Sequence, residues 1–289
     1  MASSPLPSRP PPPVARSLSS LRARIDAWRR EGQRVALVPT MGALHAGHLS
    51  LVERAARHAD RVVVSIFVNP TQFAPHEDFT SYPRDEARDL IALAGTPASL
   101  AYCPQVDEIY PPGDATAVTV AGPALGLESE TRPHFFAGVA TVVTRLLIHC
   151  APHAAVFGEK DYQQLLVIRR LVQDLALPVE ILAGPCIREA DGLALSSRNQ
   201  YLSVGERAIA PQMHRALGDL ARALRGGASA ETATDAARRQ ILDAGFAAVD
   251  YVALRDAATL DAFRPGTPGR LLAAARLGKT RLIDNIAFE

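Results

Sequence analysis

Two almost entirely apolar runs constrain the fold of this chain more than any other feature of its sequence. They lie at residues 35–38 (Val-Ala-Leu-Val) and 62–68 (Val-Val-Val-Ser-Ile-Phe-Val), and a glycine-containing loop and an amphipathic segment at 47–58 separate them. Continuous apolar strands are typical of a parallel sheet that is covered on both faces. Two such strands joined through a helix form a β-loop-α-β unit, so the chain is predicted to belong to the α/β class.

The same alternation continues along the chain and predicts its domain organisation. Helical spacing of apolar residues recurs at 18–30, 85–93, 139–148 and 165–175, with short strand-like runs at 98–102, 154–157 and 179–182. This pattern predicts a doubly wound, Rossmann-like parallel sheet over residues 17–186. From residue 187 to 289 we expect a smaller α+β domain, with helices within 205–244 and strands at 249–254, 270–275 and 280–286.

Composition and charge limit the environment and the partners of the chain. The net charge of +1 gives no bulk electrostatic case for binding nucleic acid or a membrane surface. Three distant cysteines (Cys103, Cys150 and Cys186) argue against a disulfide framework or a structural zinc site, which favours the cytoplasm. Residues 1–16 are rich in proline and are expected to form a disordered or extended tail, for which a polyproline partner motif is the less favoured alternative.

The densest chemistry lies at residues 39–48 (Pro-Thr-Met-Gly-Ala-Leu-His-Ala-Gly-His), between the first strand and the next helix. In doubly wound folds ligands bind at the carboxyl ends of strands, and a helix N-terminus there favours phosphate. Gly42 and Gly47 allow close approach of the backbone, and His45 and His48 can stabilise phosphate charge. The alternatives are a tight turn with surface histidines or a zinc site. Zinc is disfavoured because the histidines are spaced i, i+3 without a nearby third ligand.

Two later segments also carry groups that suit a nucleotide. Residues 158–161 (Gly-Glu-Lys-Asp) follow a predicted strand, where Lys160 would be a point charge for phosphate and Asp161 an acceptor for ribose hydroxyls. The alternative for this segment is a surface turn. Ser196, Ser197 and Arg198 suit a triphosphate, and the competing interpretation of this segment is a helix cap before Gly205.

These motifs carry a resemblance. The His-x-Gly-His pattern at 45–48 resembles the nucleotidyltransferase superfamily, which includes class I aminoacyl-tRNA synthetases. The longer stretch 39–48 is similar to the pantothenate synthetase family, and four further segments match in order and spacing: 67–73, 77–84, 158–164 and 196–199. The C-terminal segment 277–285 also resembles the family. The resemblance implies an HxGH-type Rossmann-like domain that binds ATP and activates pantoate.

The reaction that the resemblance implies has two steps. ATP and pantoate give pantoyl adenylate and pyrophosphate, and β-alanine then gives pantothenate and AMP. The implied catalytic residues are His45, His48, Lys160 and Arg198, with His48 at the position of the proton donor. Pantoate and β-alanine binding falls on Asn69, Gln72 and Gln164. The implied ATP-binding residues are Met41, Gly42, Ala43, Leu44, His45, Ala46, Gly47, His48, Gly158, Glu159, Lys160, Asp161, Ile187, Leu195, Ser196, Ser197 and Arg198.

The resemblance also implies Mg²⁺ with ATP, and a homodimer. No protein ligand of the metal is assigned. Asp89 is a candidate acid, and a solvated helix face accounts for it as well.

The sequence departs from the family pattern in two places. Leu195 stands where the family usually has methionine, a mild change because it conserves volume. Residues 132–138 read Arg-Pro-His-Phe-Phe-Ala-Gly instead of Arg-Pro-Gly-His-Phe-x-Gly, so His134 takes the place of a glycine and Phe135 that of the histidine. No catalytic role is therefore assigned to His134.

Two alternative functions use the same nucleotide loop. One is a nucleotidyltransferase that leaves AMP or CMP on its product, which a hydroxy-acid pocket at Gln72 and Gln164 would disfavour. The other is a non-catalytic nucleotide-binding protein, which is expected to lack His45, His48 or Lys160, whereas all three are present.

Overall fold

The chain consists of two compact units. A computed structural model describes residues 10–74 and 77–289. The first unit comprises the described residues up to Val120, His134–Gly158 and Val167–Gly184; the second comprises Ala121–Pro133, Glu159–Leu166 and Pro185–Glu289. The structure thus assigns residues 121–133 and 159–166 to the second unit, whereas the sequence-based boundary falls at 186/187.

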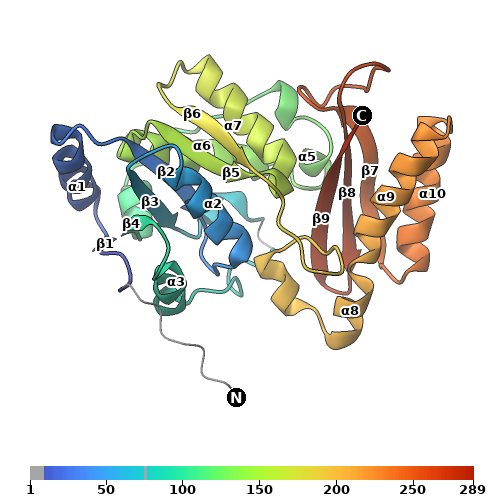
Figure 1. Ribbon diagram of the computed structural model, residues 1–289, viewed down its shortest axis with the longest axis horizontal. Coiled ribbons are helices and arrows are strands. Elements are labelled where there is room, and N and C mark those ends of the chain that lie inside the picture. Colours follow the sequence, from blue (N-terminus) through green and yellow to red (C-terminus); the bar gives the residue numbers. More distant parts are fainter. Residues whose placement is uncertain (1–9, 75–76) are drawn as a thin grey trace. The chain divides into compact units, whose positions relative to one another are not determined.

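The first unit is built on a six-stranded sheet in which every pairing is parallel (Figure 1). The strand order is β1-β4-β3-β2-β5-β6. The strands are β1 (Val14–Ala15), β2 (Val35–Thr40), β3 (Arg61–Ile66), β4 (Ala98–Tyr102), β5 (Ala154–Gly158) and β6 (Glu180–Gly184). The helices that belong to this unit are α1 (Leu18–Arg30), α2 (Ala46–Ala56), α3 (Glu86–Leu93), α4 (Val106–Ile109) and α6 (Phe135–Cys150), with the 3-10 turn η1 (Pro70–Gln72).

Both faces of this sheet are buried, as the continuous apolar runs predicted. Along β2, Ala36 and Val38 pack on one face against Leu51 and Val52 of α2. The intervening Leu37 is also fully buried, and helix α6 packs against β2. Alternate side chains of each strand therefore enter two separate apolar layers, which is why the strands show no polar face.

The order of the strands places a topological switch next to β2. The chain passes from β2 to β3 and β4 on one side and then returns to β5 on the other side, where Ala36 pairs with Ala154. Because these strands are parallel, β2 and β5 end at the same edge of the sheet. The prediction of a doubly wound α/β fold is confirmed, and ligands of such folds bind outside the carboxyl ends at this switch.

The second unit contains a three-stranded antiparallel sheet in the order β7-β8-β9. Its strands are β7 (Ala248–Asp256), β8 (Gly269–Leu277) and β9 (Thr280–Phe288). Its helices are α5 (Glu128–Thr131), α8 (Val204–Ile209), α9 (Gln212–Arg225) and α10 (Ala230–Asp243), with 3-10 turns η2 (Gly122–Ala124), η3 (Glu159–Asp161) and η4 (Ser197–Tyr201). Helix α7 (Tyr162–Asp174) contains the boundary between the two units.

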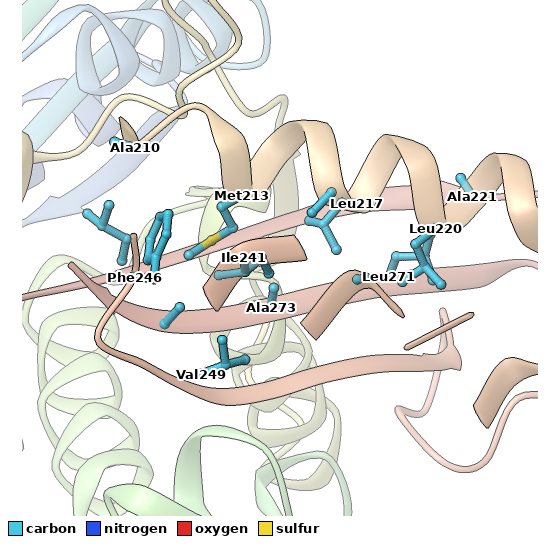
Figure 2. Packing of buried hydrophobic residues seen from close by; sticks show 14 of the residues in the cluster. Ala210, Met213, Leu217, Leu220, Ala221, Ile241, Phe246, Val249, Leu271 and Ala273 are labelled. Carbon is cyan, nitrogen blue, oxygen red and sulfur yellow. The ribbon is translucent and has the colours of Figure 1, made fainter. Parts of the chain in front are cut away.

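One face of the small sheet is covered by α9 and α10. Met213, Leu217 and Leu220 of α9 point onto the sheet near Leu271 and Ala273 of β8 (Figure 2). Small side chains in the sheet and in the helices let the backbones approach closely, which keeps the core dense. The high alanine content of residues 205–244 therefore reflects the close packing of these helices on the sheet.

The opposite face of the small sheet explains the division of the chain. Leu272 and Ala253 of the sheet form an apolar cluster with Leu127 and Leu166. The last two come from residues 121–133 and 159–166, which lie far away in sequence. These segments belong to the second unit because they cover the apolar face that α9 and α10 leave open.

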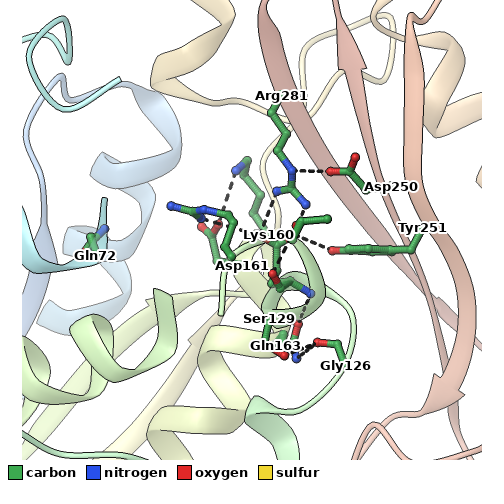
Figure 3. Close-up of polar contacts among 12 residues, drawn as sticks. Gln72, Gly126, Ser129, Lys160, Asp161, Gln163, Asp250, Tyr251 and Arg281 are labelled. Atoms are coloured by element: carbon green, nitrogen blue, oxygen red, sulfur yellow. Dashed lines mark hydrogen bonds and ion pairs between the residues drawn. The ribbon is translucent and has the colours of Figure 1, made fainter. Parts of the chain in front are cut away.

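A buried ion-pair network lies beside this cluster (Figure 3). Arg281 of β9 makes two hydrogen bonds of 2.8 Å with the carboxylate of Glu128, and its Nε donates to Asp250 at 2.6 Å. The hydroxyl of Tyr251 donates to Glu128 at 2.8 Å. Burial by itself would lower the pKa of the Arg281 guanidinium. The adjacent carboxylates of Glu128 and Asp250 outweigh burial and raise this pKa above its ordinary value. The network anchors α5 to the sheet of the second unit.

Part of the expected tail is ordered. Residues 1–9 lie outside the described residues, whereas Val14 and Ala15 pair with Ala101 and Tyr102 as the edge strand β1. A two-residue parallel strand has no periodicity that sequence reasoning could detect. Among the described residues, no helix combines the length and apolarity that crossing a membrane requires.

Candidate active site

The loop after β2 adopts a backbone conformation that depends on its glycine. Thr40 ends the strand, and its hydroxyl donates to Ser65 O and accepts from Gly42 N. Gly42 has φ of 81° and Ala43 has φ of 50°, both in the left-handed region. A Cβ added to Gly42 would lie 2.7 Å from Asp89 Oδ2, so glycine is required both by its backbone angle and by space.

The two histidines of the loop cap helix α2. His45 is the N-cap residue and its Nδ1 accepts from Gly47 N at 3.1 Å, while Nδ1 of His48 faces His45 N at 3.4 Å. Their ring centroids are 4.1 Å apart. Since each Nδ1 acts as an acceptor, a neutral ring carries its proton on Nε2. Both residues therefore have an Nε2–H donor beside the N-terminus of an 11-residue helix.

Asp89 of α3 is buried and binds the backbone of this loop. Its Oδ2 accepts from Ala43 N at 3.0 Å and its Oδ1 accepts from Leu44 N at 2.7 Å. The residue is only 3% exposed, so the interpretation of Asp89 as part of a solvated helix face is wrong. Burial raises the pKa of Asp89 above its ordinary value, and the two amide bonds oppose that rise. Both carboxylate oxygens are engaged by the loop, which makes Asp89 a positioning residue for it.

We expect Asp89→Asn to impair the loop while leaving the fold largely intact. The amide keeps one acceptor but presents an NH₂ group to the other backbone N–H. Misplacement of the loop should lower ATP-dependent turnover on the order of 10- to 100-fold, with a loss of about 1–3 kcal/mol in the free energy of unfolding. Steady-state kinetics and urea titration measure the two effects.

Asp85→Asn on the same helix is the matched control for this substitution. Asp85 caps α3 by accepting from Arg88 N at 3.0 Å, and asparagine is an equally good cap. The control removes the same charge without touching the loop. Equal kinetics for both variants would contradict the positioning role of Asp89.

Asn69 and Gln72 lie together after β3. The Asn69 amide donates to Gln72 Oε1 at 3.1 Å and to Gly138 O at 3.2 Å, and its oxygen accepts from Tyr110 OH at 2.7 Å. Gln72 Nε2 lies 2.9 Å from Met41 Sδ. The structure thus brings Met41, Asn69 and Gln72 together within the first unit. Their roles as ligands remain predictions.

Gly138, the last residue of the altered segment, contacts these amides from α6. A Cβ on Gly138 would lie 2.5 Å from Thr71 O and 2.8 Å from Gln72 Cα, so the glycine allows α6 to touch η1. His134 directly precedes α6. Its Nε2 atom is buried and has no hydrogen-bond partner among the residues that the structure describes. Gly138, one of the family positions that this chain retains, is thus required by the packing of α6 on η1.

In the second unit, Lys160, which is predicted to bind phosphate, lies in the turn η3 directly after β5. Its Nζ is 3.6 Å from Asp161 Oδ1, and 20% of its side chain is exposed against 46% for Asp161 (Figure 3). Glu159 forms an ion pair with Arg270 at 3.5 Å. Gly158 ends β5, as expected, and Gln164 follows within α7.

The segment 187–198 contains the remaining predicted ATP-binding residues of the second unit. Leu195 N donates to Ile187 O at 2.9 Å, so the two expected adenine-flanking residues are neighbours across a narrow hairpin. Ser196 caps η4 by accepting from Arg198 N at 3.3 Å. Ser196 therefore caps a 3-10 turn that contains Ser197 and Arg198, whereas the helix that contains Gly205 is capped by Ser203.

Several residues that shape the site were not predicted from the sequence. Tyr110, Gly138 and the loop-supporting role of Asp89 depend on contacts between distant segments, and no local sequence pattern indicates them.

The structure also limits where a metal ion could be held. No group of three or more histidine, cysteine, aspartate or glutamate side chains that could hold a metal ion occurs within the described residues.

A glycine–histidine loop at a helix N-terminus, at the switch point of a doubly wound sheet, defines the class of nucleotide-binding α/β proteins. A sequence model of the pantoate-β-alanine ligase family matches residues 13–287. The chain belongs to this ligase family.

Individual relatives agree with this assignment. The chain is 56% identical to pantothenate synthetase of Rhodospirillum rubrum over 276 residues, which cover 95% of this chain and 98% of the relative. The crystal structure of pantothenate synthetase from Thermus thermophilus superposes with a TM-score of 0.87 at 45% identity, covering 95% and 98% of the two chains. The pantoate-beta-alanine ligase of Francisella tularensis, complexed with beta-gamma ATP and beta-alanine, has a TM-score of 0.81 at 33% identity, covering 95% and 97%.

Proposed function

We propose that the chain condenses (R)-pantoate with β-alanine at the expense of ATP, through a pantoyl-adenylate intermediate. In the first step a carboxylate oxygen of pantoate bonds to the α-phosphorus of ATP, and the bond to the α,β-bridging oxygen breaks and releases pyrophosphate. In the second step the β-alanine nitrogen bonds to the acyl carbon and loses a proton, while the acyl–oxygen bond breaks and releases AMP. The products are pantothenate, AMP and pyrophosphate.

The loop 41–48 is proposed to hold the phosphates next to the reacting carboxylate. Negative charge grows on the phosphate oxygens during the attack, and donors that are already oriented stabilise it without reorganisation. The Nε2–H groups of His45 and His48 supply such donors, and the positive end of the α2 helix dipole adds to the attraction for phosphate. We assign His48 as the proton donor and His45 as its partner at the α-phosphate.

Residues within 158–161 and 187–198 are proposed to supply further contacts to ATP. Lys160 and Arg198 provide positive charge for the phosphates, and Ser196 and Ser197 provide further polar groups. Asp161 accepts from the ribose, and the neighbouring backbone groups of Ile187 and Leu195 flank the adenine. Gly158 ends β5 and Glu159 begins the turn that contains Lys160, and we include both residues in the proposed ATP site.

Pantoate and β-alanine are proposed to bind through Gln72, Gln164 and Asn69. An amide both donates and accepts, which suits a substrate with hydroxyls and a carboxylate. Asn69 already orients Gln72 through the 3.1 Å hydrogen bond between their amides. Its contribution to binding is therefore at least partly indirect.

Magnesium is proposed to enter with the ATP phosphates. The described residues provide no cluster for a resident metal, and the candidate Asp89 uses both oxygens for loop amides. Mg²⁺ prefers phosphate oxygens and water, and it shields the charge that the attacking carboxylate meets. On the family resemblance we further propose a cytoplasmic homodimer, and light scattering of the purified protein tests its oligomeric state directly.

The observation that carries the proposed function is the match to the family over residues 13–287. The test mixes the protein with ATP, Mg²⁺ and D-pantoate, and β-alanine is added afterwards. We expect pyrophosphate release that requires pantoate, followed by pantothenate and AMP formation that requires β-alanine. Pyrophosphate release without pantoate, or none at all, would contradict the proposal.

A further inference from the structure

Asn285 lies on the last strand, β9, and it contacts the turn that carries Lys160. Its Nδ2 donates to Lys160 O at 2.8 Å and to Glu159 O at 3.0 Å, across 125 and 126 residues of sequence. The residue is 3% exposed. One buried amide thus binds two successive carbonyls of η3.

The chemistry of its neighbours fixes the orientation of this amide. Arg270 Nε donates to Asn285 Oδ1 at 2.7 Å, and arginine can only donate. The two carbonyls can only accept, so the NH₂ group must face the turn. Both donor hydrogens and the oxygen are therefore used, and no other side chain of the same size could supply this pattern.

Arg270 extends the support to the rest of the turn. Its guanidinium lies 4.0 Å from the ring centroid of Tyr162, and its Nη2 pairs with Glu159 at 3.5 Å. The hydroxyl of Tyr162 in turn donates to Ala257 O at 2.8 Å. The sheet thus holds the turn and the start of α7 by polar and cation–π contacts, while the charged end of Lys160 points to a different neighbour, Asp161.

The backbone of β9 at Asn285 is itself braced. Asn285 N donates to Asp284 Oδ1 at 2.7 Å, and Asn285 O accepts from Arg188 Nη2 at 3.1 Å. Arg188 and Asp284 form a bidentate pair with distances of 2.7 and 2.8 Å. Asn285 therefore has little freedom to follow the turn if the turn moves, and it acts as a fixed point.

We propose that Asn285 is a positioning residue for Lys160, holding the turn 159–161 so that the Lys160 ammonium meets the ATP phosphates during adenylation. This inference rests on the proposed function, because it takes over the phosphate role of Lys160. Misplacing a charged group by about 1 Å can cost on the order of 100-fold in rate. Asn285 fixes the backbone carbonyl of Lys160, so a change at Asn285 can shift the backbone from which the Lys160 side chain extends.

The test uses variants of the full-length protein, beginning with two substitutions at Asn285 and a control. Asn285→Asp keeps the acceptor for Arg270 but turns a carboxylate oxygen toward two carbonyls. Asn285→Ser keeps one donor and carries the test if the aspartate variant does not fold. Tyr251→Phe is the control, because it removes a buried hydrogen bond to Glu128 in the same unit without touching the turn.

The readouts are the midpoint of thermal unfolding and the two half-reactions, measured separately as pyrophosphate release with pantoate and as β-alanine consumption of isolated pantoyl adenylate. We expect Asn285→Asp to slow adenylation on the order of 100-fold, and to divide its loss between the half-reactions as Lys160→Ala does. Tyr251→Phe should lose stability alone. In the Lys160→Ala background, Asn285→Asp should cost little more, since the two act through one group.

Additive losses in the double variant, or wild-type adenylation by a folded Asn285→Asp protein, would overturn the positioning role. Failure of the underlying function has a different signature. If Lys160→Ala adenylates pantoate normally, the phosphate role of Lys160 is wrong, and if the unaltered protein shows no pantoate-dependent pyrophosphate release, the proposed reaction is wrong.

Discussion

The His48→Ala protein is expected to fold and to lose pantoate-dependent pyrophosphate release on the order of 100- to 1,000-fold. That range is typical for removal of one preorganised donor to developing charge. The stability loss should be small, because the hydrogen bond between His48 Nδ1 and His45 N is long, at 3.4 Å. Single-turnover pyrophosphate release measures the first effect and thermal unfolding the second.

Two further substitutions at His48 separate its two nitrogens. His48→Asn places an acceptor where Nδ1 caps the helix but has no group at the position of Nε2. His48→Gln can place an amide N–H near the position of Nε2 but loses the cap. We expect the glutamine variant to be the more active and the asparagine variant the more stable. The reverse order of activity would remove the Nε2–H group from the proposed mechanism.

Glu128→Ala is expected to cause the largest loss of stability among the substitutions considered. It leaves the Arg281 guanidinium buried with Asp250 alone, and breaking a buried ion pair from one side costs about 3–5 kcal/mol. The midpoint of thermal unfolding should fall on the order of 10 °C. Calorimetry measures the shift, and the transition of the second unit should carry it because all of these partners lie there.

An exposed ion pair provides the control for Glu128. Arg170 and Asp174 are 2.7 Å apart on α7, with side chains 53% and 46% exposed. Arg170→Ala should cost only about 0.3–0.5 kcal/mol, since water already solvates both charges. Similar losses for the two substitutions would mean that the Glu128 network is solvated in solution and does not anchor α5.

Every strand except β1 was predictable, because the side-chain pattern of these strands is local. The apolar runs at 35–38 and 62–68 lie in parallel strands, and β4 has the predicted bounds of 98–102. Strand β1 was missed because two residues carry no period, and its pairing with β4 is decided by an edge far along the chain. The fold class follows from apolar patterns that short stretches of sequence contain. The edge strand β1 depends instead on its pairing with β4, which lies more than 80 residues away.

The candidate site was predictable where its groups are consecutive in sequence. The loop 39–48 and the turn 158–161 could be identified because each follows a strand. The supports of these segments could not. Asp89 reaches Leu44 across 45 residues, and Asn285 reaches Lys160 across 125. In the sequence each looks like an ordinary polar residue of a helix or strand, because the carbonyls and amides that it binds are present in every residue.

Likewise, residues 121–133 and 159–166 joined the second unit through Leu127 and Leu166, which cover the small sheet. Their apolar side chains gave no sign of which core they would enter. A boundary drawn from texture alone therefore placed them with the neighbours along the chain.

The long sequence separation between Asn285 and Lys160 has a consequence for synthesis of the protein. At about 5–20 residues per second, translation of the 125 residues between them takes on the order of 10 seconds. During that time the nascent chain can already form the parallel sheet and its histidine loop, while the lysine turn lacks its brace. The two segments that are proposed to bind phosphate therefore mature at different times, and the lysine turn is completed only when the last strand has emerged and paired.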